Sequence, residues 1–151
     1  MDKYRVRCIF DKIDRNKTIR VKVPGSKSIT NRTLLIAALA EGETILKGAL
    51  FSNDAKNMLA CLNTLGIKME IDEENETITV QGCGGRLPVR EASVNVGSAG
   101  TAARFLTALL AFSEGVYHLD ASEQMKKRPM KPLLDARSEE HTSELQSHSE
   151  I

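Results

Sequence analysis

A pattern of strand, glycine turn and helix occurs twice in this sequence. In the first copy, polar and branched apolar residues alternate over residues 18–23, and Pro24-Gly25 leads into a helix expected over residues 28–40. In the second copy, a strand expected over residues 92–96 leads through another glycine turn into a helix expected over residues 101–112. Such a repeat predicts two βα units that lie side by side and bring two helix starts toward one region.

Single residues also match between the two copies. The pairs with one common offset are Gly25-Ser26 with Gly97-Ser98, Arg32 with Arg104, and Leu34 with Leu106. After one inserted residue, Glu41-Gly42 aligns with Glu114-Gly115. Because these matches keep the order of strand, turn, helix and strand, we expect the two arginines to share one site.

The stretch between the two copies predicts a helix and a β-hairpin. Ser52-Asn53-Asp54 offers N-cap side chains to an amphipathic helix that Gly66 closes. Residues 68–71 and 77–81 read as two strands joined by an acidic turn. This stretch therefore adds an antiparallel pair of strands to the fold.

The first helix is apolar on nearly every face over residues 34–40, so we expect it to be buried, with Gly42 as its C-terminal cap. A short strand is expected at residues 44–46. Together these elements indicate an α/β (α+β) fold. A chain of 151 residues can bury one ordinary core and not two.

The charge balance argues against several classes of partner. The sequence has 21 Lys and Arg against 20 Asp and Glu, so no broad field attracts nucleic acid or anionic lipid. Two Tyr and four Phe offer few platforms on which bases can stack. We therefore expect no nucleic-acid partner and no membrane partner, although a nucleic-acid binder that uses the basic run at residues 126–128 is a weaker alternative.

The cysteines and the N-terminus indicate the compartment. Cys8, Cys61 and Cys83 are odd in number and have no metal-ligand spacing, which favours reduced thiols. The first residues lack the apolar segment of a signal peptide. We expect a soluble, cytoplasmic protein.

The stretch Gly25-Ser26-Lys27-Ser28 invites comparison with the phosphate-binding P-loop, but the match fails. A serine separates the glycine from the lysine, and Val21 stands where that motif needs its first glycine. A glycine turn that opens a helix still exposes free N–H groups and a partial positive charge, to which Lys27 and Arg32 add full charges. This pattern predicts an anion site, with solvated surface charges as the alternative.

Two further stretches have the same character. Residues 97–101 open the second helix with two glycines, and Arg104 repeats the position of Arg32. Residues 126–132 form a basic run, in which the following proline biases Arg128 toward an extended conformation. A guanidinium held in this way suits bidentate capture of a carboxylate or phosphate. The alternatives are a tight turn at the first stretch and a solvated loop at the second.

The three stretches PGSKSITNR, GSAGTAARFL and KKRPMKPLLD closely resemble the 5-enolpyruvylshikimate-3-phosphate synthases, also called 3-phosphoshikimate 1-carboxyvinyltransferases. The resemblance covers residues 17–136. It implies transfer of the enolpyruvyl group of phosphoenolpyruvate to the 5-hydroxyl of shikimate 3-phosphate, with release of phosphate, in aromatic amino-acid biosynthesis. It implies a monomer that acts on these small-molecule substrates, and neither a metal nor an organic cofactor.

The resemblance also assigns site residues. Lys27 would be the catalytic residue and would touch both substrates. Ser28 and Arg32 would join it in binding shikimate 3-phosphate, and Gly100 and Arg128 would join it in binding phosphoenolpyruvate. Lining the same pocket would be Ser98, Thr101 and Arg104. Ser98 departs from the asparagine expected there in many members, although a serine can still form one hydrogen bond. Lys27-Ser28 also points away from the related transferase that acts on UDP-N-acetylglucosamine, which usually has Lys-Asn there.

Length is the larger departure from the family. The resemblance implies two domains, each built from three βαβαββ units, with the substrates between them; about one and a half units are found here. Residues 1–20 would form a strand region that packs with a missing second domain, and residues 21–136 would form a partial first substrate-binding domain. Residues 137–151 have almost no apolar residues and resemble the translation of a sequencing-adapter oligonucleotide. We expect this tail to be disordered and an artefact.

Two functional hypotheses follow. The first is an N-terminal fragment of the synthase that is truncated by a sequencing or assembly error and is inactive by itself. The second is a non-catalytic module that binds small anions.

Overall fold

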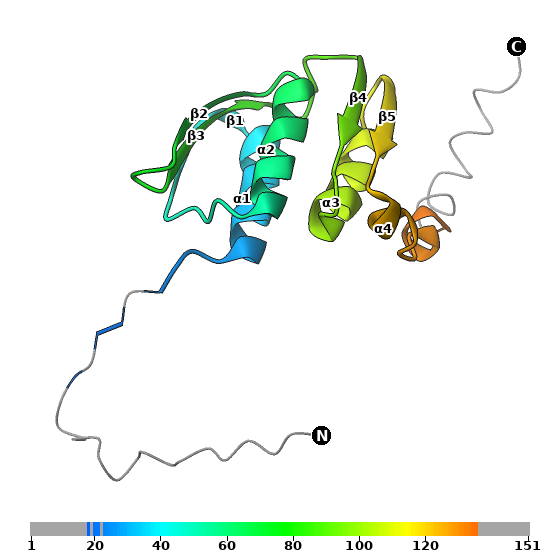
Figure 1. The fold of residues 1–151 in the computed structure, drawn as a ribbon. Helices are drawn as coiled ribbons and strands as arrows, with labels where there is room; N and C mark the ends of the chain where they lie inside the picture. The colour runs from blue at the N-terminus through cyan, green and yellow to red at the C-terminus, as the bar shows by residue number, and fades with distance from the viewer. Residues whose placement is uncertain (1–17, 19, 22, 136–151) are drawn as a thin grey trace, which may run out of the picture.

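The computed structural model describes residues 18, 20, 21 and 23–135 of the chain (Figure 1). Four helices and five strands follow one another in these residues. In chain order they are α1 (Lys27–Leu39), β1 (Glu41–Lys47), α2 (Asn53–Thr64), β2 (Lys68–Asp72), β3 (Thr77–Cys83), β4 (Glu91–Asn95), α3 (Gly100–Ala111), β5 (Val116–Asp120) and α4 (Glu123–Lys126). Residues 131–135 are also helical. The mixture of helices and strands confirms the α/β (α+β) fold class.

The first sheet has three antiparallel strands in the order β1-β3-β2. The predicted hairpin is confirmed, because β2 and β3 pair with Ile71 opposite Ile78 and Met69 opposite Val80. Ile78 and Val80 alternate on the central strand and are fully buried. This alternation fixes which face of the sheet meets the helices.

The second sheet consists of β4 and β5, which run parallel with Glu91 opposite Val116 and Asn95 opposite Asp120. Parallel neighbours need a crossover connection, and α3 provides it. The second predicted strand, turn, helix and strand unit is therefore confirmed.

One hydrophobic core joins the helices and both sheets. Its largest fully buried apolar side chains are Leu34, Met58, Leu62, Leu65, Ile67, Ile78, Val80, Val96 and Leu106. The amphipathic helix predicted after Ser52 is confirmed, because Met58, Leu59 and Leu62 lie on its buried face. No helix in the part of the chain that the structure describes is both long and apolar enough to cross a membrane.

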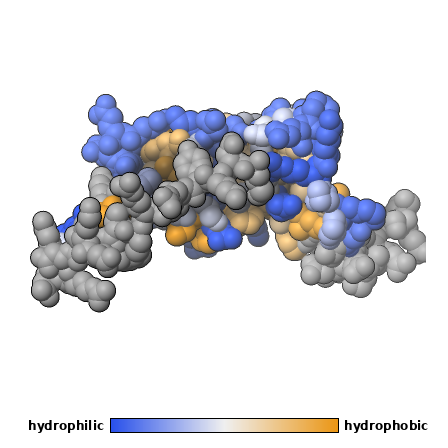
Figure 2. Space-filling view, turned by 60° about the horizontal axis from the view of Figure 1, so that its bottom comes forward, coloured by the Kyte–Doolittle hydropathy of each residue, from blue (hydrophilic) through white to orange (hydrophobic). Residues whose placement is uncertain are grey.

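Not every apolar side chain joins this core. Large apolar residues that stay about half exposed or more include Ile29, Ile36, Ile45, Phe112 and Val116. Figure 2 shows hydrophobic surface at several separate places among hydrophilic side chains on one face of the molecule. The prediction of a buried helix therefore holds for one side of α1 only, because Leu34, Ala37 and Ala38 are buried whereas Ile29 and Ile36 are exposed.

Two other local predictions were wrong. A strand is expected over residues 18–23, but the described residues of that range, 18, 20, 21 and 23, have no strand structure. Val21 and Val23 are each 73% exposed. A strand needs a neighbour to satisfy its N–H and C=O groups, and these residues pair with none. Gly42 does not cap α1, because the helix ends at Leu39 with Ala40 as its C-cap, and Gly42 lies within β1.

Candidate functional site

The N-termini of α1, α2 and α3 lie at the same end of the molecule (Figure 1). The turn before α1 confirms the predicted helix start, because Ser26 is the N-cap and its Oγ accepts a hydrogen bond from the Ile29 N–H. Ser52 caps α2 in the same way through the Ala55 N–H. Three helix starts that face one way add their partial positive charges at one end of the fold.

Lys27 is held by a carboxylate from the second helix. Its Nζ lies 2.8 Å from Asp54 Oδ2, and the Lys27 side chain is 52% exposed whereas that of Asp54 is 19% exposed. Asp54 belongs to the first turn of α2. This ion pair fixes the ammonium beside two helix N-termini and leaves half of its surface open to a ligand.

Close main-chain packing sets the distance between these two helices. A Cβ at Gly25 would collide with the Gly48 carbonyl oxygen and would lie 3.1 Å from the Leu50 nitrogen. The Leu50 N–H donates to Oγ1 of Thr30, a buried residue of α1, at 3.0 Å. The turn that leads to α2 is thus bound to the start of α1, which explains how Asp54 comes within reach of Lys27.

The second helix is bound in turn to the glycine turn before α3. Nδ2 of Asn57 donates to the Val96 carbonyl at 3.2 Å, and a Cβ at Gly97 would lie 2.8 Å from the same Nδ2. The ends of β4 and β5 hold this turn from the other side, because the Ser122 N–H donates to the Gly97 carbonyl at 2.9 Å. The first and second predicted anion-binding stretches therefore share α2 as their common support.

The start of α3 differs from the other two helix starts. Its N-cap is Ala99, which has no side-chain oxygen to accept from the first-turn N–H groups. Gly100 is buried, and a Cβ there would lie 2.8 Å from Nη1 of Arg128. The structure thus brings the second and third predicted stretches together, with a guanidinium over an uncapped helix start.

A short helix positions Arg128. Ser122 caps α4, and the Arg128 N–H donates to the Met125 carbonyl at 2.9 Å. Met125 is 2% exposed, and its Sδ lies 3.7 Å from the position of a Cβ on Gly100. The buried thioether therefore anchors the turn that carries the guanidinium.

Lys126 belongs to the predicted basic run but does not offer its charge to a ligand. Its Nζ lies 3.0 Å from Asp120 Oδ1 and 3.2 Å from Glu123 Oε1. The pKa of Asp120 lies below its ordinary value because the Ala121 N–H donates to this carboxylate and Lys126 lies beside it. The same two carboxylates raise the pKa of Lys126. This lysine ties α4 to the end of β5.

The arginines of the three stretches have no such partners. Among residues 23–135, neither Arg32, Arg104 nor Arg128 forms an ion pair, and all three are exposed. Ser28 and Ser98 are also exposed, and Thr101 is half-buried. The predicted site residues thus lie on the first turns of α1 and α3 and beyond α4. Within residues 23–135, these three arginines therefore have no carboxylate partner that an anionic ligand would have to displace.

Asn31 is the unusual polar residue of α1. Its side chain is fully buried, and neither its Oδ1 nor its Nδ2 has a hydrogen-bond partner in the structure. An amide buried in this way destabilises the fold by about 1–3 kcal/mol. Its counterpart in the repeat, at the same offset as Arg32 and Arg104, is the buried Ala103.

Sequence reasoning missed the residues that support this site. The sequence indicates Asp54 only as a cap, and it gives no signal for Asn57 or Met125. No local pattern could identify them, because each acts on residues far away in the chain. Among the described residues there is no cluster of three His, Cys, Asp or Glu side chains with the geometry of a metal site.

Comparison with known proteins gives a consistent result. A sequence model of the EPSP synthase family (3-phosphoshikimate 1-carboxyvinyltransferase) matches residues 13–140. A 3-phosphoshikimate 1-carboxyvinyltransferase of Trichormus variabilis is 49% identical over 114 residues, and one of Ralstonia nicotianae is 50% identical over 115 residues. Each match covers 76% of this chain.

Solved structures agree with this assignment. The structure of an EPSP synthase from Acinetobacter baumannii superposes with a TM-score of 0.70 at 28% identity, over 78% of this chain and 26% of that one. The chain spans 27% of the Trichormus relative and 26% of the Ralstonia relative, so it corresponds to about a quarter of their length. On the family match and the close relatives together, this chain belongs to the EPSP synthase (3-phosphoshikimate 1-carboxyvinyltransferase) family.

Proposed function

We propose that this chain forms one side of the active site of an enzyme that transfers the enolpyruvyl group of phosphoenolpyruvate to the 5-hydroxyl of shikimate 3-phosphate. The observation that carries this proposal is the guanidinium of Arg128 over Gly100 at the uncapped start of α3. An uncapped helix start with an unpaired guanidinium binds a phosphate or carboxylate well. We propose that the complete enzyme acts as a monomer in the cytoplasm, and the free thiols of Cys61 and Cys83 support that setting.

The proposed roles follow the two halves of the site. For phosphoenolpyruvate, the binding groups are Lys27, Gly100 and Arg128. For shikimate 3-phosphate, they are Lys27, Ser28 and Arg32, and Ser98, Thr101 and Arg104 line the pocket. Lys27 is the proposed catalytic residue, because it is the one group assigned to both substrates, and its half-exposed ammonium can exchange Asp54 for substrate anions.

These cations address the main difficulty of the reaction. Each substrate has a phosphate and a carboxylate, so the two molecules repel one another. Fixed positive groups offset this repulsion and hold the 5-hydroxyl against the enol carbon. The hydroxyl oxygen bonds to that carbon while its proton leaves and a proton joins the methylene carbon. Departure of phosphate and loss of one methyl proton then restore the enol ether.

We further propose that the chain is inactive by itself, because groups from the rest of the relatives' length must supply the remaining proton transfers. A chimaera tests the function directly. In it, this chain replaces the segment of the Trichormus variabilis relative that it matches, and phosphate release is measured with both substrates. We expect release by the chimaera at a rate comparable to that of the relative, and none by the 151-residue chain.

Two results would count against this proposal. Turnover by the 151-residue chain alone would show that its own residues complete the reaction. A folded chimaera that binds both substrates without releasing phosphate would favour a module that binds small anions without catalysis.

A further inference from the structure

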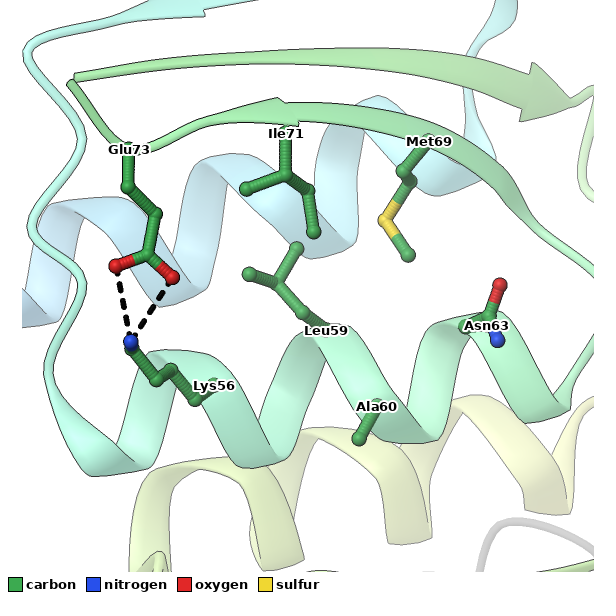
Figure 3. Close-up of a pocket in the computed structure, with 7 residues that line it drawn as sticks. All are labelled: Lys56, Leu59, Ala60, Asn63, Met69, Ile71 and Glu73. Atoms are coloured by element: carbon green, nitrogen blue, oxygen red, sulfur yellow. Dashed lines mark hydrogen bonds and ion pairs between the residues drawn. The ribbon is translucent and has the colours of Figure 1, made fainter. Parts of the chain in front are cut away.

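A groove separates α2 from the edge strand β2 (Figure 3). Its volume is about 390 Å³, and it is lined by Lys56, Leu59, Ala60, Asn63, Met69, Ile71 and Glu73. Met69 and Ile71 are two residues apart on β2, so both point toward α2, where Leu59 meets them. The middle of the groove is therefore apolar, although Ile71 remains 49% exposed.

One end of the groove carries two opposite charges. Nζ of Lys56 donates to both carboxylate oxygens of Glu73 at 2.9 Å. The two side chains are 50% and 55% exposed. An ion pair this exposed contributes at most about 1 kcal/mol, so a ligand that offers both side chains new partners can separate them easily.

This groove lies on a different face of α2 from the proposed substrate site at the starts of α1 and α3. Lys56, Leu59 and Asn63 recur at spacings of three and four residues and form one stripe of the helix. Asp54, Asn57 and Cys61 form another, which contacts Lys27, Val96 and Asn95. No residue of the groove takes part in the proposed enolpyruvyl transfer.

We propose that the groove binds a free α-amino acid with a large apolar side chain. The α-carboxylate would pair with Lys56 and the α-ammonium with Glu73, so both protein charges keep a partner. A ligand with a single charge would leave one of them without a partner at the groove. Charge complementarity thus selects a zwitterion at this end.

The rest of the groove fits the side chain of such a ligand. Burial of an apolar group against Leu59, Met69 and Ile71 removes exposed apolar surface from water. An aromatic ring gains further from contact with the thioether of Met69. A volume of about 390 Å³ lies at the small end of ligand pockets, as a single amino acid requires.

Calorimetric and NMR titration of the 151-residue chain with L-phenylalanine tests the proposal. We expect saturable binding with a dissociation constant on the order of 1 mM or tighter, and shifts confined to residues of the groove. Three related ligands each lack one of the recognised groups. The α-ammonium is absent from N-acetylphenylalanine, the α-carboxylate from phenylalaninamide and the apolar side chain from glycine. We expect each of them to bind at least about tenfold more weakly.

Variants test whether phenylalanine binds in the groove or elsewhere on the surface of the chain. Lys56→Met and Glu73→Gln should each weaken phenylalanine binding at least about tenfold. Ile71→Thr keeps a strand-forming residue and should weaken it through the apolar part of the groove. Lys131→Met is the matched control, because it removes the exposed Lys131–Asp135 pair elsewhere, and binding should not change.

The proposal is overturned if phenylalanine does not bind, or if N-acetylphenylalanine binds equally well. Equal effects of Lys131→Met and Lys56→Met would also overturn it. Inorganic phosphate should bind at the proposed substrate site and not in the groove, so it should not displace phenylalanine. Loss of enolpyruvyl transfer in the chimaera would leave phenylalanine binding unaffected, so the two proposals fail independently.

Discussion

The ammonium of Lys27 lies 2.8 Å from the carboxylate of Asp54, and this contact joins the first turn of α1 to the first turn of α2. Asp54 is the more buried partner, so it stays in place while the lysine can turn toward solvent. A substrate anion bound at this end, as we propose, would therefore compete with Asp54 for Lys27.

Replacing Lys27 should impair function far more than stability. In the chimaera, Lys27→Met should lower kcat/KM at least about 100-fold, because it removes the cation that we propose acts on the reacting groups. The half-exposed ion pair contributes at most about 1 kcal/mol, so the melting temperature should change little. Lys47→Met, which removes an exposed lysine at the end of β1, is the control and should retain the parent rate.

Replacing Gly100 should act through Arg128. A Cβ at this position would lie 2.8 Å from Nη1, which is the mobile end of a long side chain, so the guanidinium moves and the fold does not. We expect Gly100→Ala in the chimaera to raise KM for phosphoenolpyruvate about tenfold, as loss of one charged hydrogen bond would. KM for shikimate 3-phosphate should change little. Steady-state kinetics with each substrate varied would refute this if both constants stayed at the parent values.

Lys126 should position Arg128 and should not itself bind the substrate anion. Lys126→Met removes the link between α4 and β5, so Arg128 should become less ordered and KM for phosphoenolpyruvate should rise a few-fold. Lys126→Arg, which keeps the link to Asp120, should restore the parent value. If Lys126→Met and Lys126→Arg behaved alike, the link would have no positioning role.

The same link predicts a pH dependence. The pKa of Asp120 is lowered in the folded chain, so its stabilising contribution is present above the ordinary carboxyl pKa of about 3.9 and is lost as pH falls through the lowered value. The amide signals of α4 in the 151-residue chain should therefore shift below about pH 4. Asp120→Asn should abolish this shift, and persistence of the same titration in that variant would contradict the assignment.

Replacing Asn31 with alanine should stabilise the folded chain. Asn31→Ala removes a buried amide without hydrogen bonds, adds a better helix former and copies the buried Ala103 of the repeat. We expect the free energy of unfolding of the 151-residue chain to rise by about 1 kcal/mol, measured in urea. A loss of stability would show that the amide has a partner that the structure does not record.

Local patterns predicted the elements whose signals are local. Ser52 and Gly66 mark the two ends of α2, and the alternation around Ile78 and Val80 identifies the hairpin, because capping and burial act on neighbouring residues. The prediction of a strand over residues 18–23 was wrong because alternation indicates strand propensity but does not supply a partner strand.

The candidate site was predictable only in part. Glycine turns and arginines are visible in the sequence, and the helix starts at Lys27 and Gly100 were found within one residue. The contacts of Lys27 with Asp54 and of Gly100 with Arg128 depend on tertiary packing between distant segments. Lys126 looked like its neighbours in the basic run, and only the position of Asp120 shows that its charge is already paired.

The most direct test of the proposed site is the kinetic effect of Arg128→Lys in the chimaera. Lysine keeps the positive charge but cannot form the bidentate contact, so kcat/KM for phosphoenolpyruvate should fall about 100-fold or more. Lys127→Met, at the neighbouring exposed cation, should change it by less than about threefold, as expected for a solvated surface charge. Equal activity of Arg128→Lys and the parent chimaera would contradict the assignment of this guanidinium to the substrate.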